Sequence, residues 1–282
     1  MEHPDKIITL GKSILQYGPY NQRIYLMHFC KEDQNQVMDW INKQVQKNVL
    51  SKVIAKVSQD CSSIFIQKGY RLEAQIPKYY PNGNSVNFVA NYFNDLKRKK
   101  EPRQEYLSKI LAMAKNKFNQ LSNVSMDTSF TFRKMKEDDV QSMSRLYRIV
   151  FPSYPFPIYD ESYLKQTMAE MVDYFGIFYK NDLVALSSIE KSQYDPNAEM
   201  TDFATLPIYQ KKGLAAYLLH EMEQYAKTMY QFKTIYTIAR AYSIGINTIF
   251  SKAGYSYGGT LTNNTNIHGQ IESMNVWYKA FS

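Results

Sequence analysis

The segment Gln210-Lys211-Lys212-Gly213-Leu214-Ala215 lies between two elements of different character. Before it, a strand expected over residues 199–206 stops at a proline. After it, a helix starting at Gly213 carries an apolar stripe made of Leu214, Leu218, Met222, Tyr225 and Met229. A helix start has unpaired N–H groups and a partial positive charge, and small residues let an anion approach the backbone. The segment therefore predicts a phosphate-binding loop; the alternative is an ordinary helix start with solvated lysines.

The elements around this loop follow a regular order. The expected strands are 130–133, 175–179, 183–189, 199–206, 234–238, 255–261 and 274–278. The expected helices are 137–150, one from residue 160 or 162 to 172, one starting at Gly213, and 246–252. The order β-α-α-β-β-β-α-β-α-β-β predicts an α/β (α+β) fold in which a mixed, mainly antiparallel sheet is flanked by helices.

The residues before this region predict an additional, smaller α/β domain. A charge run at 95–101 followed by Pro102 indicates an exposed boundary, and helical spacing predicts a linker helix over 103–121. We place the domains at 1–122 and 123–282. Strands are expected at 6–10, 24–27 and 53–57, and a helix at 33–50. Residues 62–70 resemble residues 247–255; we favour a generic glycine cap before a strand, and the alternative is a partial, cofactor-free copy of the second fold.

Composition excludes several classes of protein. Two cysteines outside any CxxC pair and four scattered histidines argue against a disulfide framework or a metal site. The N-terminus lacks the pattern of a signal peptide, and no run of 18 apolar residues exists, so we expect a cytoplasmic protein without a membrane segment. The net charge of +8 suits an anionic partner, but no recognisable nucleic-acid motif supports nucleic-acid binding.

In this context the loop resembles the acetyl-CoA pyrophosphate loop of the GCN5-related N-acetyltransferases (GNAT), over roughly residues 130–282. The resemblance implies that acetyl-CoA is bound by the loop and by residues elsewhere in the domain. The implied contacts are Phe203, Ala204, Thr205, Leu206, Gln210, Lys211, Lys212, Gly213, Leu214, Ala215, Asn247 and Phe250. Phe250 replaces the tyrosine that protonates the leaving thiolate in many members, which leaves Ser243, Tyr242 and Tyr255 as candidates for that role.

Two longer peptides resemble a narrower family, the beta-lysine N-acetyltransferases. They are residues 10–27 (LGKSILQYGPYNQRIYLM) and 151–158 (FPSYPFPI). This resemblance runs the length of the chain. It implies transfer of acetyl to the ε-amine of β-lysine in a ternary complex, giving N6-acetyl-β-lysine, a compatible solute (osmolyte).

The reaction requires a base, because an amine with a pKa of ~10.4 is protonated at neutral pH. Glu190 and Glu199 are the leading candidates for this base. Asp202 lies on the same expected strand as Glu199 but at opposite parity, so the two side chains face opposite sides of the sheet unless a bulge intervenes. A backbone N–H of Thr205 or Leu206 is the expected oxyanion donor. For the acceptor, the candidates are Arg240 as a clamp for its carboxylate and Tyr154 and Phe156 as walls for its aliphatic chain.

Two other functions stay open on the sequence alone. One is a catalytically idle acetyl-CoA-binding regulatory module, suggested by Phe250, and the other is a GNAT enzyme acting on a different amine, such as a diamine or amino acid. The expected partner is a small-molecule amine. No role for residues 1–122 follows from the sequence; covering the acceptor site and forming a homodimer are the two possibilities.

Overall fold

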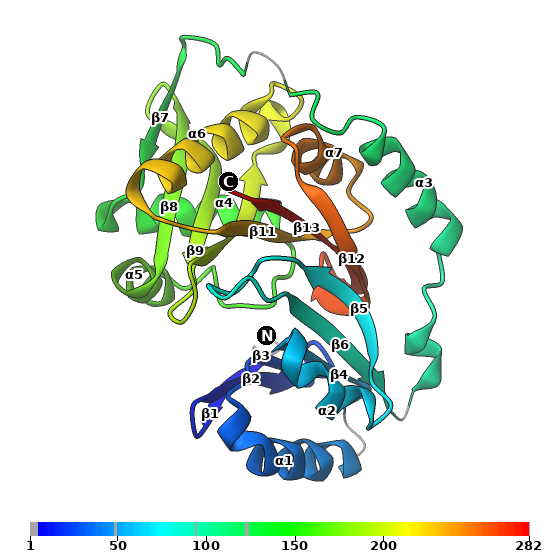
Figure 1. Ribbon diagram of the computed structural model, residues 1–282. Helices are drawn as coiled ribbons and strands as arrows, with labels where there is room; N and C mark the ends of the chain where they lie inside the picture. Colours follow the sequence, from blue (N-terminus) through cyan, green and yellow to red (C-terminus); the bar gives the residue numbers. More distant parts are fainter. Residues whose placement is uncertain (1–4, 48–49, 94, 122–123, 282) are drawn as a thin grey trace.

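The computed structural model describes residues 5–47, 50–93, 95–121 and 124–281, and within these ranges it contains one thirteen-stranded sheet (Figure 1). The strand order is β1-β2-β3-β4-β6-β5-β12-β13-β11-β10-β9-β8-β7. The first six of these strands come from the N-terminal half of the chain and the other seven from the C-terminal half. The domain boundary predicted near residue 122 lies outside the described residues.

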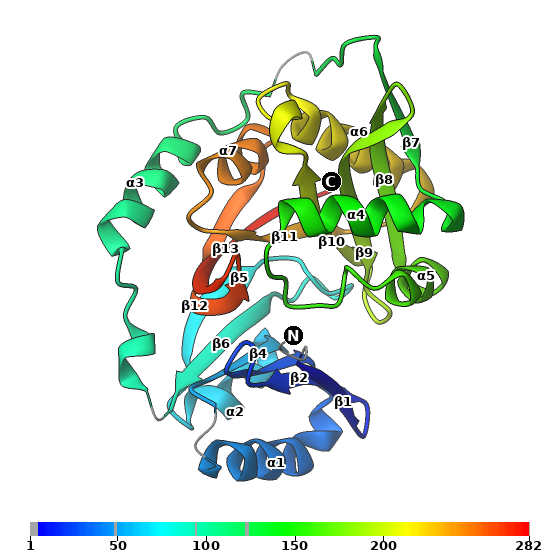
Figure 2. The ribbon, with the colours of Figure 1, turned by 180° about the vertical axis from the view of Figure 1, so that it is seen from behind.

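The C-terminal half confirms the predicted element order. Its strands are β7 (Phe130–Lys134), β8 (Val172–Tyr179), β9 (Asp182–Lys191), β10 (Asn197–Thr205), β11 (Thr234–Arg240), β12 (Ser256–Ile267) and β13 (Gln270–Ala280). Its helices are α4 (Val140–Val150), α5 (Glu161–Glu170), α6 (Leu214–Met229) and α7 (Ile244–Lys252). Helices α6 and α7 cover one face of the sheet, and α4 and α5 cover the other, as the view from behind shows (Figure 2).

The N-terminal half contains more strands than its sequence pattern predicted. Its strands are β1 (Lys6–Leu10), β2 (Ser13–Gly18), β3 (Arg23–His28), β4 (Lys52–Ser58), β5 (Arg71–Ile76) and β6 (Val86–Tyr92). Its helices are α1 (Gln34–Gln46) and α2 (Ser62–Ile66), and α3 (Gln104–Lys115) follows as the linker and packs against α7.

Most differences from the predicted boundaries concern residues whose pairing is set by distant strands. β2, β5 and β6 were not predicted. β12 extends beyond the expected residue 261 to Ile267, and β13 is longer than expected at both ends. The helix expected to reach residue 172 ends at Glu170, because Val172 begins β8 and pairs with Glu190 on β9. The predicted helices at 33–50 and 103–121 are also shorter, at 34–46 and 104–115.

The two halves of the sheet meet through β5 and β12, which pair at Ala74 and Gly259. Gly259 has φ +143, and a Cβ atom there would lie 2.2 Å from the Glu73 carbonyl oxygen. At Gly258 a Cβ atom would lie 2.6 Å from the carbonyl oxygen of Gln75. The glycine pair thus allows an approach of the two backbones that a side chain would prevent.

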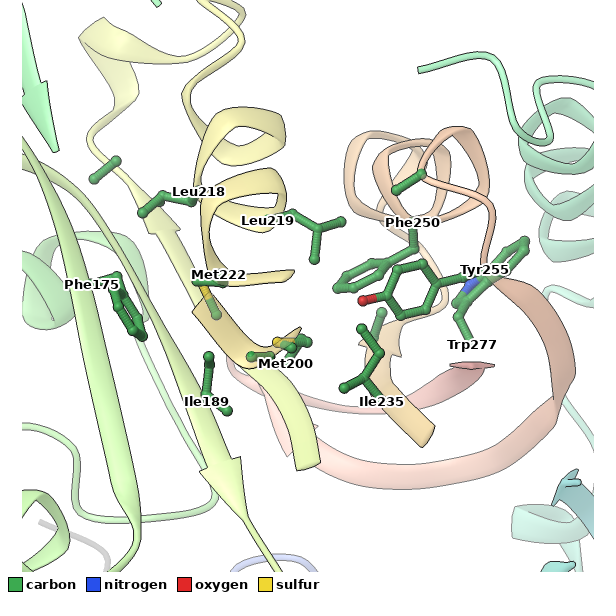
Figure 3. Close-up of a cluster of buried hydrophobic side chains, with 14 of the residues drawn as sticks. Phe175, Ile189, Met200, Leu218, Leu219, Met222, Ile235, Phe250, Tyr255 and Trp277 are labelled. Carbon is green, nitrogen blue, oxygen red and sulfur yellow. The ribbon is translucent and has the colours of Figure 1, made fainter. Parts of the chain in front are cut away.

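Buried side chains fill the space between the sheet and its helices. Figure 3 shows part of the core under α6, in which Leu218, Leu219 and Met222 face Met200 of β10 and Ile235 of β11. A separate cluster includes Phe88 from the N-terminal half and Tyr236, Leu261 and Val276 from the C-terminal half. The halves therefore share an apolar contact. Among the described residues, no helix has the length and apolar character needed to span a membrane.

Candidate active site

The site begins where β10 and β11 separate. The two strands run parallel and pair only over Asn197–Glu199 and Thr234–Tyr236, although both are described to their ends. Beyond Glu199, a bulge between Thr201 and Ala204 bends β10, and Asp202 in the bulge has φ +57. A bulge of this kind terminates strand pairing and redirects side chains. The result is a slot between the two strands in the centre of the C-terminal sheet.

The predicted phosphate-binding loop lies at the open end of this slot. Gly213 precedes α6 with φ +79, and a Cβ atom there would meet nothing within 4 Å, so the space in front of the helix is open. The first helical bond runs from Tyr217 N to Gly213 O at 3.0 Å, and no side chain of a described residue caps the helix start. The first-turn N–H groups fit a phosphate group. Lys211 lies at the cavity edge, whereas Lys212 is exposed outside it.

A cavity of about 1010 Å³ extends from this helix start through the slot to the N-terminal half. The C-terminal half contributes Gln210, Gly213, Leu214 and Ala215, together with the carboxylates described below. The side chains from the N-terminal half include those of Ile14, Arg23, Tyr25, Met27, His28, Lys56, Tyr79 and Tyr80. The N-terminal half is therefore one wall of the cavity.

Glu190 and Glu199, the two candidate bases, are direct cross-strand partners on β9 and β10. Both line the cavity, and Glu190 is exposed to it. Removal from bulk water, followed by the charge of Glu190, raises the pKa of Glu199 to about 8, while Lys56 acts in the opposite direction. Ile238 N donates to Glu199 Oε1 at 3.2 Å. Glu199 is thus a carboxylate poised to exchange a proton near neutral pH.

Asp202 reaches the same cavity because of the bulge. Without it, strand alternation would turn Glu199 and Asp202 to opposite faces; with it, both line the cavity. The hydroxyl of Tyr154 donates to Asp202 Oδ1, and Ser188 Oγ donates to Oδ2 at 2.8 Å. Burial raises the pKa of Asp202. Each of its oxygens already has a protein donor, so Glu199 is the freer acceptor for a substrate proton.

The backbone of β10 presents alternate residues to the slot. Leu206 N donates to Val184 O of the β9–β10 hairpin at 2.9 Å, so Leu206 is unavailable as an oxyanion donor. Thr205 pairs with Ala185 in a position without mutual hydrogen bonds, which turns its N–H away from β9 and toward the slot. Phe203 and Thr205 line the cavity, whereas the Ala204 and Leu206 side chains pack in the core.

Three predicted contacts are corrected by the structure. Arg240 lines the cavity, but its Nε and Nη2 donate to the buried Glu272 at 2.9 and 2.8 Å. The edge of the guanidinium formed by these two nitrogens is therefore unavailable as a clamp for a carboxylate. Asn247 is fully buried, and its side chain bonds to Arg240 O, Ser243 O, Asn275 and Trp277. It holds α7 against the sheet and is not free for a cofactor.

Phe250 is also a core residue. It is fully buried, and its ring packs edge-on against Phe203 and Tyr255, as the right side of Figure 3 shows for Tyr255. Of the candidates for protonating a thiolate, Tyr255 is fully buried and the Tyr242 hydroxyl donates to Glu101. Ser243 lines the cavity.

The two long peptides singled out in the sequence meet beside the cavity. Gln16 Nε2 donates to Pro155 O at 3.2 Å, and both Tyr154 and Phe156 line the cavity. Their role as walls for the aliphatic chain of the acceptor stays a prediction. Arg23 and Lys56 also line the cavity and were not among the residues predicted from the sequence. Arg23 lies inside the first quoted peptide, and that is the one sequence feature that pointed to it; nothing in the sequence distinguished Lys56.

Comparison with known proteins identifies the family. The profile of the Acetyltransferase (GNAT) family matches residues 140–245. The chain is 38% identical over 281 residues to a beta-lysine N(6)-acetyltransferase of Methanococcus maripaludis, with 98% of each chain covered. It is 28% identical over 270 residues to N-acetyltransferase YodP of Bacillus subtilis, with 95% of each covered. A beta-lysine N(6)-acetyltransferase of Methanosarcina mazei is 29% identical over 74% of this chain and 83% of its own. This chain belongs to the GNAT family of N-acetyltransferases.

Proposed function

We propose that this protein transfers an acetyl group from acetyl-CoA to the ε-amine of β-lysine, giving N6-acetyl-β-lysine. The supporting observation is the 38% identity to the M. maripaludis enzyme over 98% of both chains. The matched region spans both halves and therefore every wall of the cavity. Similarity confined to the C-terminal half would have supported an acetyltransferase with an unspecified acceptor.

The donor site is assigned to the start of α6 and the neighbouring β10 backbone. Acetyl-CoA supplies an activated thioester and a pyrophosphate. The uncapped N–H groups after Gly213 suit the pyrophosphate, and Lys211 adds positive charge at the cavity edge. The Thr205 N–H, directed into the slot, is placed to donate to the carbonyl oxygen that gains negative charge during attack.

Glu199 is the proposed base. The acceptor ammonium must lose a proton before its nitrogen attacks the thioester carbon, and a base with a pKa near the working pH is most effective. Burial brings the pKa of Glu199 to about 8, within that range. Burial also raises the pKa of Glu190, its cross-strand partner, which attracts the ammonium group when it is ionised. As the new C–N bond forms, the C–S bond breaks and the sulfur takes up a proton; Ser243 is the proposed donor or relay for that proton.

The test is direct. The full chain is incubated with acetyl-CoA and β-lysine, thiol release is followed, and fragmentation mass spectrometry locates the acetyl group. We expect one equivalent of CoA released per acetyl group added, with the acetyl at N6. Lysine, diamines and spermidine serve as competing acceptors. Preferred turnover of another amine would refute β-lysine as the acceptor, and calorimetric CoA binding without thiol release from any amine would indicate a binding module.

A further inference from the structure

We propose that Arg23, on β3 of the N-terminal half, binds the carboxylate of the acceptor, so that one half holds the substrate while the other half acetylates it. The inference rests on the proposed function, because it assigns one end of the acceptor to a subsite. Arg23 takes the role that the sequence suggested for Arg240, whose Nε and Nη2 are bound by Glu272.

Arg23 is a buried guanidinium that forms no salt bridge with a described residue. It is 3% exposed and lines the cavity, and no described carboxylate forms a salt bridge with it. Its Nη1 donates to Asn264 O at 2.8 Å and Thr265 Oγ1 at 3.0 Å, and its Nη2 donates to Gln16 Oε1 at 3.2 Å. Its Nε has no partner among the described residues. These hydrogen-bond partners are neutral. The Tyr25 ring centroid lies 5.2 Å from Arg23 Cζ, and Asp5 acts on Arg23 through space without a salt bridge. A bound anion would therefore pair directly with the buried charge.

The other cations of the cavity differ from Arg23 in this respect. Arg240 forms a salt bridge with Glu272, and Lys191 Nζ lies 3.4 Å from Asp173 Oδ2. Burial lowers the pKa of Lys56, and the charges of Glu199 and Glu190 act in the opposite direction. Lys211 belongs to the loop before α6. Among the described cavity residues, Arg23 is therefore the guanidinium that no protein carboxylate pairs with in a salt bridge.

Arg23 also lies at a suitable place relative to the carboxylates. Tyr25 follows it on the same face of β3, about 7 Å further along the strand. Arg23 Cζ lies 5.2 Å from the centroid of the Tyr25 ring. Burial raises the pKa of Tyr25, Glu199 and Glu190 raise it further and Arg23 lowers it, so Tyr25 lies within the influence of both groups. β-Lysine carries its carboxylate at one end and its ε-amine at the other. An acceptor lying along Tyr25 has its carboxylate at Arg23 and its amine at Glu199.

Gln16 connects this subsite to the loop that walls it. Its amide oxygen accepts from Arg23, and its amide nitrogen donates to Pro155 O. The same side chain thus fixes the guanidinium and positions the loop bearing Tyr154 and Phe156. The two peptides that resemble beta-lysine N-acetyltransferases are linked at the proposed subsite for the substrate carboxylate.

The experiment compares two acceptors and two variants. 1,4-Diaminopentane is β-lysine without its carboxylate and keeps both amines. Arg23→Gln removes the guanidinium. Arg98→Gln is the matched control, because Arg98 is also a buried arginine bonded to Asn263 O, Gln22 O and Asn21 O but does not line the cavity. KM and kcat are measured for each pair, and calorimetry measures acceptor binding to the CoA-loaded protein.

We expect wild-type protein to bind β-lysine roughly 30-fold or more tightly than the diamine. Arg23→Gln should raise KM and Kd for β-lysine by a similar factor and change those for the diamine less than threefold. Arg98→Gln should leave the preference for β-lysine unchanged. Equal weakening of both acceptors by Arg23→Gln, or equal binding of both by wild-type protein, would overturn the proposal.

Two further outcomes separate this inference from the proposed function. If Arg23→Gln does not fold, Arg23→Lys takes its place, since it keeps the positive charge but loses the planar pair of donors. It should weaken the binding of β-lysine and not that of the diamine, and equal weakening of both would overturn the proposal. If wild-type protein binds β-lysine through Arg23 but releases no CoA, the subsite stands and the proposed acetyl transfer fails. If it acetylates β-lysine and the diamine equally well, the transfer stands and the subsite fails.

Discussion

The two halves of the molecule share one arrangement of strands and differ in local chemistry. The N-terminal order β1-β2-β3-β4-β6-β5 corresponds to β8-β9-β10-β11-β13-β12 in the C-terminal half. In each half one helix joins the pair of parallel strands, α1 between β3 and β4 and α6 between β10 and β11. Topology therefore does not explain why the sequence predicts a phosphate-binding loop in only one half.

The difference lies at the helix start and between the parallel strands. The turn before α1 carries Glu32 and Asp33, and Asp33 is bonded to the backbone N–H groups of Lys12 and Ser13. Carboxylates at this place repel a phosphate. β3 and β4 pair over Arg23–Leu26 and Lys52–Ala55, whereas β10 and β11 pair only over Asn197–Glu199 and Thr234–Tyr236. The N-terminal half instead contributes side chains to its neighbour's cavity.

The largest expected effect is the loss of catalysis when the Glu199 carboxylate of the C-terminal half is removed. Glu199→Gln keeps the shape of the side chain and removes its basicity, so kcat should fall roughly 10²- to 10⁴-fold. Glu32→Gln, at the start of the corresponding N-terminal helix turn, should leave kcat within twofold. Stopped-flow or steady-state thiol release measures both. Activity of Glu199→Gln within fivefold of wild type would move the role of base to another group.

The same variant tests how pH affects stability. Folding raises the pKa of Glu199 from its ordinary 4.5 to about 8, so the folded protein holds this proton more tightly than the unfolded chain. The contribution is present below about pH 4.5 and is lost as pH rises toward 8. Wild-type Tm should therefore fall relative to that of Glu199→Gln between pH 5 and pH 8. Parallel Tm curves for the two proteins would contradict the raised pKa.

A substitution at Gly259 tests the pairing of β5 with β12, through which the two halves of the sheet meet. Gly259→Ala places a Cβ atom against Glu73 O and Ala74, so we expect a loss of about 2–3 kcal/mol in the free energy of unfolding. Gly83→Ala is the control, since Gly83 also has positive φ but open space around it; the expected cost is about 1 kcal/mol. Urea denaturation measures both. Equal costs would mean that the close approach of β5 and β12 is unimportant for stability.

A smaller effect is expected when the chemistry of one helix start is transferred to the other. Gly213→Asp introduces a carboxylate where the N-terminal half has Asp33, and the Kd for CoA should rise roughly 10- to 100-fold. Gly213→Asn is the isosteric control, and asparagine tolerates positive φ. Isothermal calorimetry gives both affinities. If the two variants bind CoA equally, the charge at this helix start does not select the anion.

The smallest expected effect concerns electrostatic coupling between the halves. Lys56 lowers the pKa of Glu199, so Lys56→Met should raise it and move the acidic limb of the kcat/KM profile upward by roughly 0.5–1 pH unit. Lys43→Met, on the exposed side of α1, should leave the profile in place. A profile unchanged by Lys56→Met would show that the N-terminal half shapes the cavity without influencing the base.

The C-terminal half was predictable because its elements are defined locally. The stripe on α6, the proline after β10 and the hairpin turn at Asn181 are short-range patterns, and the whole element order follows from them. The N-terminal strands were harder to predict. The residues of β6 are buried between β4 and β5, so their pattern lacks the alternation that marks a half-exposed strand. Whether residues 1–122 are a partial copy of the acetyltransferase fold stays a prediction.

The sequence by itself determined the loop before α6, the order of elements around it and the candidates Glu190 and Glu199, because helix starts and strand alternation are properties of neighbouring residues. Only the tertiary structure decided which side chains are free to act. Arg240, Asn247 and Phe250 are occupied or buried by residues distant in sequence. Asp202 enters the cavity through a bulge. Arg23 reaches it from the other half, since the partners that satisfy or leave open a buried polar group are fixed by packing across the whole sheet.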